Sequence, residues 1–132
     1  MNILVMGCNR IGAMVVRELV QEGHQVTVMD NTEENLRRIP PTLGARTLLA
    51  DGTSEDDLRR AGIQGADAFF AIGAGDARNA FAAQKVRFLF QVPKVVCLIY
   101  DPIRQQMFRD LGVDAISPSK MISSMLLETL RK

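Results

Sequence analysis

The sequence predicts an α/β protein with a Rossmann-like, doubly wound parallel sheet. Short, nearly continuous apolar runs alternate with segments that carry helix signals from one end of the chain to the other. This rhythm is typical of parallel strands that helices cover on both faces. A glycine-containing loop follows the first apolar run and opens the first helix, as in dinucleotide-binding folds. We therefore expect a three-layer sandwich with strand order 3-2-1-4-5-6.

The apolar runs are the expected strands. They lack the polar alternation of a strand that faces water on one side, which indicates burial on both faces. In chain order they span Asn2–Met6, Gln25–Met29, Arg46–Ala50, Ala66–Ile72, Lys94–Ile99 and Asp114–Ile116.

The helices are expected between these runs. Residues 10–21 repeat apolar side chains at helical spacing, and Gly23 supplies the stop. A short helix over about residues 33–38 ends before Pro40, because proline cannot continue a helix. Residues 76–90 form a long segment rich in alanine.

Capping residues mark the starts of the other helices. The side chain of Asn, Ser or Asp can accept a hydrogen bond from the first turn, and a carboxylate three residues on or a following proline strengthens the pattern. Asn31, Ser54, Asp101 and Ser117 fit it. The helix after Ser117 carries one apolar face, made of Met121, Ile122, Met125, Leu126 and Leu130.

Composition restricts the class of protein. The 132 residues suit a single domain over 1–132, and 47% hydrophobic with 23% charged residues is ordinary for a soluble globular chain. The net charge of +1 lacks the basic excess of a nucleic-acid binder. Two cysteines that lie 89 positions apart and one histidine offer no metal motif. No apolar stretch is long enough for a membrane span, so we expect a cytoplasmic protein.

The candidate phosphate-binding loop follows the first strand. It comprises Gly7, Cys8, Asn9, Arg10, Ile11 and Gly12. Gly7 suits a tight turn and Gly12 suits close packing of helix on strand, while the helix N-terminus offers N–H groups to a phosphate. Asn9 replaces the glycine that normally lets the backbone approach a pyrophosphate, and it narrows that approach. Arg10 is expected to pair with a phosphate oxygen.

Other candidate ligands follow the next strands. Asp30, with its neighbour Asn31, ends the second strand, where a carboxylate accepts hydrogen bonds from ribose hydroxyls and repels the 2′-phosphate of NADP. The remaining candidates are Asp51, Gly52, Thr53, Gly73 and Ala74, after the third and fourth strands. Two alternatives stay open: Asp51 as an ordinary turn residue, and a Rossmann-like domain that has lost its ligand.

Taken in order, these segments resemble the nucleotide-binding N-terminal domain of potassium-transport regulators, a family called TrkA-N, KTN or RCK. The resemblance also rests on Leu58–Ile63, Asp76 with Asn79, and Leu111–Asp114, and it covers about residues 1–130. It implies a cytoplasmic regulatory domain rather than an enzyme. Such domains bind NAD(H), ATP, ADP or AMP, and they assemble as dimers in a ring beneath a potassium channel or transporter.

The resemblance also implies roles for particular residues. Gly7, Arg10 and Gly12 would hold phosphates, Asp30 the ribose, and Asp51 with Thr53 the adenine side. The chain departs from the family pattern at three positions. Asn9 stands at the position of the second glycine, Leu98 lies where an arginine is common, and Gly73 lies where a threonine is common. A mononucleotide such as AMP would tolerate these losses best.

Three functions compete at this point. The first is a nucleotide sensor that assembles into a ring, and this ring lies at the membrane against a transporter. The second is a ligand-free partner that completes a ring beside an active paralogous chain, which Asn9 and Leu98 favour. The third is a small NAD-dependent oxidoreductase, which the sequence disfavours because Tyr100 is the only tyrosine and no Tyr-x-x-x-Lys pattern exists.

Overall fold

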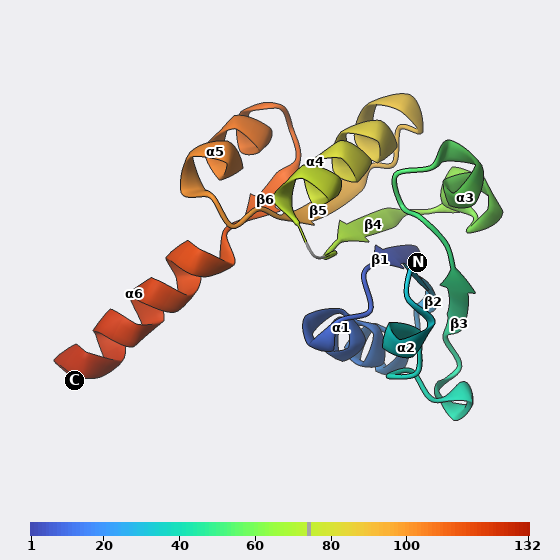
Figure 1. Cartoon of the computed structure of the whole chain (residues 1–132), viewed down its shortest axis with the longest axis horizontal. Helices are drawn as coiled ribbons and strands as arrows, with labels where there is room; N and C mark the ends of the chain where they lie inside the picture. The colour runs from blue at the N-terminus through green and yellow to red at the C-terminus, as the bar shows by residue number, and fades with distance from the viewer. Residues whose placement is uncertain (74) are drawn as a thin grey trace.

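A six-stranded parallel sheet forms the centre of the molecule (Figure 1). The computed structural model describes residues 1–73 and 75–132. The strands are β1 (Asn2–Met6), β2 (Gln25–Asp30), β3 (Arg46–Leu49), β4 (Ala68–Ala71), β5 (Lys94–Leu98) and β6 (Asp114–Ile116). Their order is β3-β2-β1-β4-β5-β6, so the predicted topology is confirmed. The order reverses between β1 and β4, where Met6 pairs with Ala71.

Helices cover both faces of the sheet. They are α1 (Arg10–Gln21), α2 (Glu33–Leu36), α3 (Glu55–Arg60), α4 (Asp76–Gln84), α5 (Pro102–Asp110) and α6 (Pro118–Arg131), with short turns at Pro41–Leu43 and Ile63–Gly65. A π-helical turn, Lys85–Leu89, follows α4 directly. Figure 1 shows α1 and α2 below the sheet and α3, α4 and α5 above it. The expected three layers are therefore present.

Alternating side chains of the central strands divide between two cores. Leu4, Met6 and Phe69 pack in the core under α3 and α4. Ile3 and Val5 pack in the core under α1. All five are at most 6% exposed, as expected for strands buried on both faces.

Most of the expected caps are confirmed, with one exception. The side chains of Ser54, Asp101 and Ser117 accept hydrogen bonds from the first turns of α3, α5 and α6. The prediction that Asn31 caps the second helix is wrong. Thr32 is instead the residue that precedes α2, and it makes no side-chain cap bond. Its N–H donates to Asp30 Oδ1 at 2.8 Å, and its hydroxyl donates to Asn31 Oδ1 at 3.2 Å.

The helix α6 extends away from the sheet (Figure 1). Pro118 is its only buried residue, and its apolar side chains are exposed, up to 82% for Leu130. Ile116, at the end of the neighbouring strand β6, is also exposed. Within the described parts of the chain, the structure contains no helix with the length and apolarity needed to cross a membrane.

Candidate functional site

A cavity of about 270 Å³ opens at the carboxyl ends of β1, β2 and β3, beside the loop after β4. This is the topological switch point, where open α/β sheets bind ligands. Its lining combines backbone, apolar and polar groups: Met6, Gly7, Asn9, Met29, Asp30, Asn31, Thr32, Asn35, Ala50, Gly52, Gly73 and Arg78.

The two glycines of the first loop are required by close backbone contacts. Gly7 has φ +112°, and its N–H donates to Met29 O at 2.8 Å. A Cβ on Gly7 would lie 2.7 Å from the carbonyl carbon of Ile72, which has no room to move. A Cβ on Gly12 would overlap the carbonyl oxygen of Gly7. The sequence-based prediction of a tight turn and close helix packing is therefore supported by geometry at both positions.

Asn9 uses both ends of its side-chain amide to hold this loop. Its Oδ1 accepts a hydrogen bond from the N–H of Gly12 at 2.9 Å, which caps α1. Its Nδ2 donates to Ile72 O at 2.8 Å, at the end of β4. Asn9 has φ −76°, so it does not need the positive φ that glycine would allow. The residue that replaces the second glycine thus joins α1 to β4 across the switch point.

The carboxylate of Asp30 lines the cavity and already accepts several hydrogen bonds. The N–H of Cys8 donates to Oδ2 at 2.8 Å, and the N–H of Thr32 donates to Oδ1 at 2.8 Å. Asn35 Nδ2 lies 3.3 and 3.4 Å from the two oxygens. Arg38 in turn donates to Asn35 Oδ1 at 2.7 Å. Asp30 therefore connects the first loop to α2, in addition to facing the cavity.

The thiol of Cys8 points away from the cavity. Its side chain is fully buried in the core under α1. Burial, and secondarily the negative charge of Asp30, raises the pKa of the Cys8 thiol above its ordinary value. The thiol is therefore protonated at neutral pH and is a packing group.

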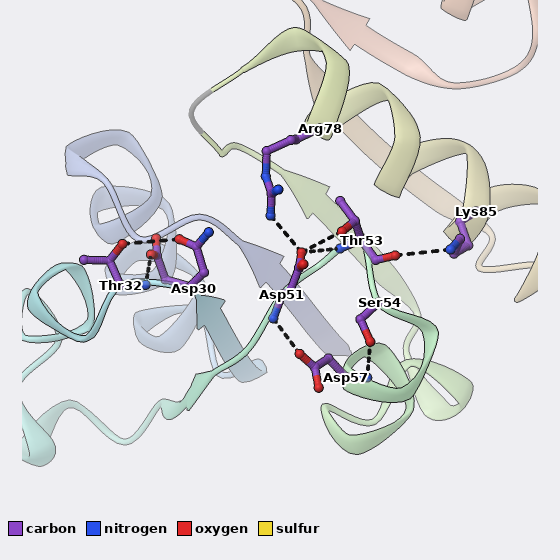
Figure 2. Close-up of polar contacts among 9 residues, drawn as sticks. Asp30, Thr32, Asp51, Thr53, Ser54, Asp57, Arg78 and Lys85 are labelled. Atoms are coloured by element: carbon purple, nitrogen blue, oxygen red, sulfur yellow. Dashed lines mark hydrogen bonds and ion pairs between the residues drawn. The ribbon is translucent and has the colours of Figure 1, made fainter.

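Asp51 lies at the cavity's edge, at the centre of a polar cluster (Figure 2). Its Oδ1 accepts hydrogen bonds from Thr53 N at 2.9 Å, from Thr53 Oγ1 at 2.7 Å and from Arg78 at 2.7 Å. The backbone and hydroxyl donors of Thr53, with a smaller contribution from Arg78, hold the pKa of the Asp51 carboxyl below its usual range. The N–H of Asp51 donates to Asp57 Oδ2 at 2.7 Å, so the turn is also fixed to α3.

Asn79, on α4, holds the loop after β4 through hydrogen bonds. It is fully buried, and its Nδ2 donates to Gly73 O at 3.2 Å and to Leu98 O at 3.0 Å. Both bonds join the ends of β4 and β5. A Cβ on Gly73 would come within 3.1 Å of Asn79 Oδ1, so this position favours glycine. Ala74, the last predicted site residue, lies outside the described residues.

The structure brings part of the predicted set together. Six predicted residues line the cavity: Gly7, Asn9, Asp30, Asn31, Gly52 and Gly73. Six others do not: Cys8, Arg10, Ile11, Gly12, Asp51 and Thr53. Arg10 and Ile11 are exposed on the first turn of α1, and the expected pairing of Arg10 with a phosphate therefore has no support from the lining.

Sequence reasoning missed three polar residues of the lining: Thr32 just before α2, Asn35 on α2 and Arg78 on α4. All three lie at the start of the helix that directly follows a site strand, in or near its first turn. Position in the first turn after a site strand is the signal that could have found them. That position alone does not predict which side chain of the first turn faces the cavity.

Comparisons with known proteins agree with this architecture. Over 130 residues the chain is 36% identical to the Trk system potassium uptake protein TrkA of Streptomyces coelicolor, covering 98% of this chain and 58% of the relative. The chain thus spans little more than half the length of that relative.

Two solved structures share the fold. The TrkA-N domain of the inner membrane protein ybaL from Escherichia coli has a TM-score of 0.85 at 14% identity, covering 98% of this chain and 96% of that one. The Shewanella denitrificans Kef CTD in an AMP-bound form has a TM-score of 0.78 at 22% identity, covering 99% and 80%. The TrkA-N domain model matches residues 3–118, and the chain therefore belongs to the TrkA-N domain family.

Proposed function

We propose that this chain is a nucleotide-sensing domain of a potassium uptake system and acts by binding rather than by catalysis. The observation that carries the proposal is the cavity at the switch point, bounded by the Gly7 turn and the Asp30 carboxylate. Turns of this kind accept phosphates, and a carboxylate at the end of the second strand accepts ribose hydroxyls. The curated relative from Streptomyces coelicolor, a potassium uptake protein, supports the physiological setting.

The cavity favours a mononucleotide over a dinucleotide. Its volume of about 270 Å³ is just below the range of small-molecule sites, which run from about 300 to 1,000 Å³. We assign the phosphate to the Gly7 turn, the ribose to Asp30 with Asn31, and the adenine to the side of Gly52. AMP or ADP fits this arrangement better than NAD(H) or ATP. The AMP-bound Kef structure supports the choice, as a property of that protein.

The charge of the site disfavours NADP. The N–H of Cys8 on the first loop and the N–H of Thr32 just before α2 donate to the two oxygens of Asp30 and hold the carboxylate in place. A 2′-phosphate on the ribose would lie against this negative charge. Exclusion of NADP is therefore an expected property of the same residue that binds ribose.

We further propose that two copies of the chain associate through α6. The exposed Met125, Leu126 and Leu130 form part of an apolar helix face that a soluble monomer would leave in water. A second copy of α6 can cover this face. A nucleotide that binds one dimer geometry more tightly than another would shift the population between them. In a cytoplasmic ring below a membrane transporter, that shift would regulate ion flow.

One observation favours a second candidate, a ligand-free partner in such a ring beside a paralogous chain. Both carboxylate oxygens of Asp30 and the Oδ1 of Asp51 already accept hydrogen bonds from groups of this chain. A nucleotide would have to replace some of these donors. The two candidates differ in whether any adenine nucleotide binds the purified domain.

The first test is calorimetric titration, with thermal melting in parallel, using AMP, ADP, ATP, NAD, NADH and NADP. A ligand that binds only the folded state raises the melting temperature once its concentration exceeds its Kd. We expect AMP or ADP to bind and NADP not to bind. The Asp30→Asn variant, with its fold checked by circular dichroism, is expected to lose at least about tenfold in affinity. A folded wild-type domain that binds none of the six would select the ligand-free candidate.

The association is tested separately by sedimentation velocity. The Met125→Glu variant places a charge on the apolar face of α6 and should be monomeric where the wild type is dimeric. The Lys132→Gln variant, at the helix end, serves as a matched control, because it also lowers the net charge by one. A Met125→Glu protein that stays dimeric would assign the interface to another surface.

A further inference from the structure

Arg78 is the one cation among the described residues that line the cavity. It lies in the first turn of α4 and reaches across to the end of β3, where it meets Asp51 (Figure 2). The same cavity is lined by Gly7 in the turn after β1 and by Gly73 on the loop after β4. An anion bound at the glycine turns would therefore enter the space that the guanidinium borders.

We propose that Arg78 binds the phosphate of the nucleotide, and that Asp51 is the partner it leaves when the nucleotide enters. This inference rests on the proposed function and adds to it the residue that distinguishes a nucleotide from a nucleoside. Nothing in the sequence pattern assigns Arg78, because the fingerprint directs attention to Arg10, which is exposed outside the cavity.

The resting ion pair is weak enough to exchange. The side chains of Arg78 and Asp51 are 49% and 44% exposed, and an ion pair this accessible to water contributes little stability. A phosphate carries more negative charge than a carboxylate, and a guanidinium can give it two parallel hydrogen bonds. Only one of the five N–H donors of arginine is needed for the contact with Asp51, at 2.7 Å.

Asp51 remains in position after the exchange. Two donors from Thr53, the backbone N–H and the hydroxyl, hold the same Oδ1 at 2.9 and 2.7 Å. These bonds do not depend on Arg78, and they are the larger causes of the lowered pKa of Asp51. The turn that presents Gly52 to the cavity is thus independent of the ligand, and the arginine is the part that moves.

The need for such a cation follows from the rest of the site. The Asn9 side chain lies where a second glycine would have opened the loop backbone to the phosphate. Leu98, on β5, offers no charge at the position where the resemblance implies an arginine. Without Arg78, the described residues that line the cavity would present the anion with the carboxylate of Asp30 and with no positive side chain to compensate it.

The test is calorimetric titration of the wild type and the Arg78→Gln variant with AMP and with adenosine. We expect Arg78→Gln to weaken AMP binding by at least about tenfold, as for loss of a charge-assisted hydrogen bond, and to leave adenosine binding within about twofold. Arg78→Lys keeps the charge and should recover part of the AMP affinity. Arg104→Gln is the matched control, because Arg104 makes a similarly exposed pair with Asp101 outside the cavity.

A second variant tests the exchange itself. Asp51→Asn retains an acceptor for Thr53 and removes the charge that competes for Arg78, so AMP should bind up to about fivefold more tightly. Weaker AMP binding by Asp51→Asn would overturn its role as resting partner. Equal AMP affinity of wild type and Arg78→Gln, or an equal loss for adenosine, would overturn the inference alone. A wild type that binds no adenine nucleotide would overturn the proposed function and, with it, this inference.

Discussion

Replacing Asn9 by alanine removes two hydrogen bonds at once from the loop that bounds the cavity. One is the N-cap of α1, from Gly12 N–H to Asn9 Oδ1 at 2.9 Å. The other runs from Asn9 Nδ2 to Ile72 O at 2.8 Å. Loss of an N-cap costs about 1 kcal/mol, and loss of a partly buried hydrogen bond costs about 1 kcal/mol more. We therefore expect the free energy of unfolding to fall by about 2 kcal/mol.

That loss is measurable as a shift in melting temperature. The entropy of unfolding is about 2.1 cal/mol/K per residue, which for the 132 residues of this chain is roughly 0.28 kcal/mol/K. A change of about 2 kcal/mol should then lower the Tm by about 7 °C. Differential scanning calorimetry gives the Tm, and urea denaturation gives the free energy independently.

Two other variants separate the contributions of the bonds. Asn9→Asp keeps the acceptor that caps α1 and loses the donor to Ile72, so its loss should be about half that of alanine. Asn31→Ala is the control, because Asn31 is exposed and, among the described residues, its side chain has a single hydrogen bond, from the neighbouring Thr32 hydroxyl at 3.2 Å. An Asn9→Ala protein that melts within about 2 °C of the wild type would refute the reasoning.

Three further predictions concern stability, acid and thiol chemistry. Gly12→Ala should lower the free energy of unfolding, measured by urea denaturation, by more than about 3 kcal/mol, because the added methyl group would overlap the carbonyl oxygen of Gly7. Gly65→Ala is the control and should change the free energy of unfolding little, because the space around Gly65 is open. The pKa of Asp51 is lower in the folded state than its unfolded value of about 3.9, so its contribution is present above that pH and is lost as the pH falls through the folded pKa. Asp51→Asn should accordingly lose less stability than the wild type between pH 5 and pH 2, and an identical acid profile would contradict this assignment. Burial raises the pKa of Cys8, and it raises that of Cys97 to about 12, so neither thiol should react with a disulfide reagent at pH 8 until urea unfolds the chain.

The strands and their order could be predicted, because burial on both faces identifies parallel strands and the glycine loop after the first strand indicates the doubly wound order. Runs such as Asn2–Met6 lack polar alternation, and such runs form stable strands only where helices cover both faces of a parallel sheet. The ends of β2 and β4 were less predictable. Their last paired residues depend on neighbouring strands, so Asp30 belongs to β2, while Ile72 follows β4.

The sequence also predicted that the glycines and Asp30 lie at the candidate site. Their place is set by connectivity, because the carboxyl ends of parallel strands meet at one edge of the sheet. Local hydrogen bonding produced the errors. Asp30 accepts the N–H of Thr32 two residues later, and this turn displaced Asn31 from the capping position.

The role of Arg78 could not be read from the chain, because it depends on how α4 is rotated about its own axis. That rotation is set where Ala82, Ala83 and Val86 pack in the core against the sheet. Asp51 illustrates the same limit, since its position after β3 predicted a cavity-lining carboxylate and its bonds to Thr53 turned it to the edge. Sequence periodicity and strand connectivity thus specify which edge of the sheet binds a ligand, whereas packing between distant segments specifies which side chains reach it.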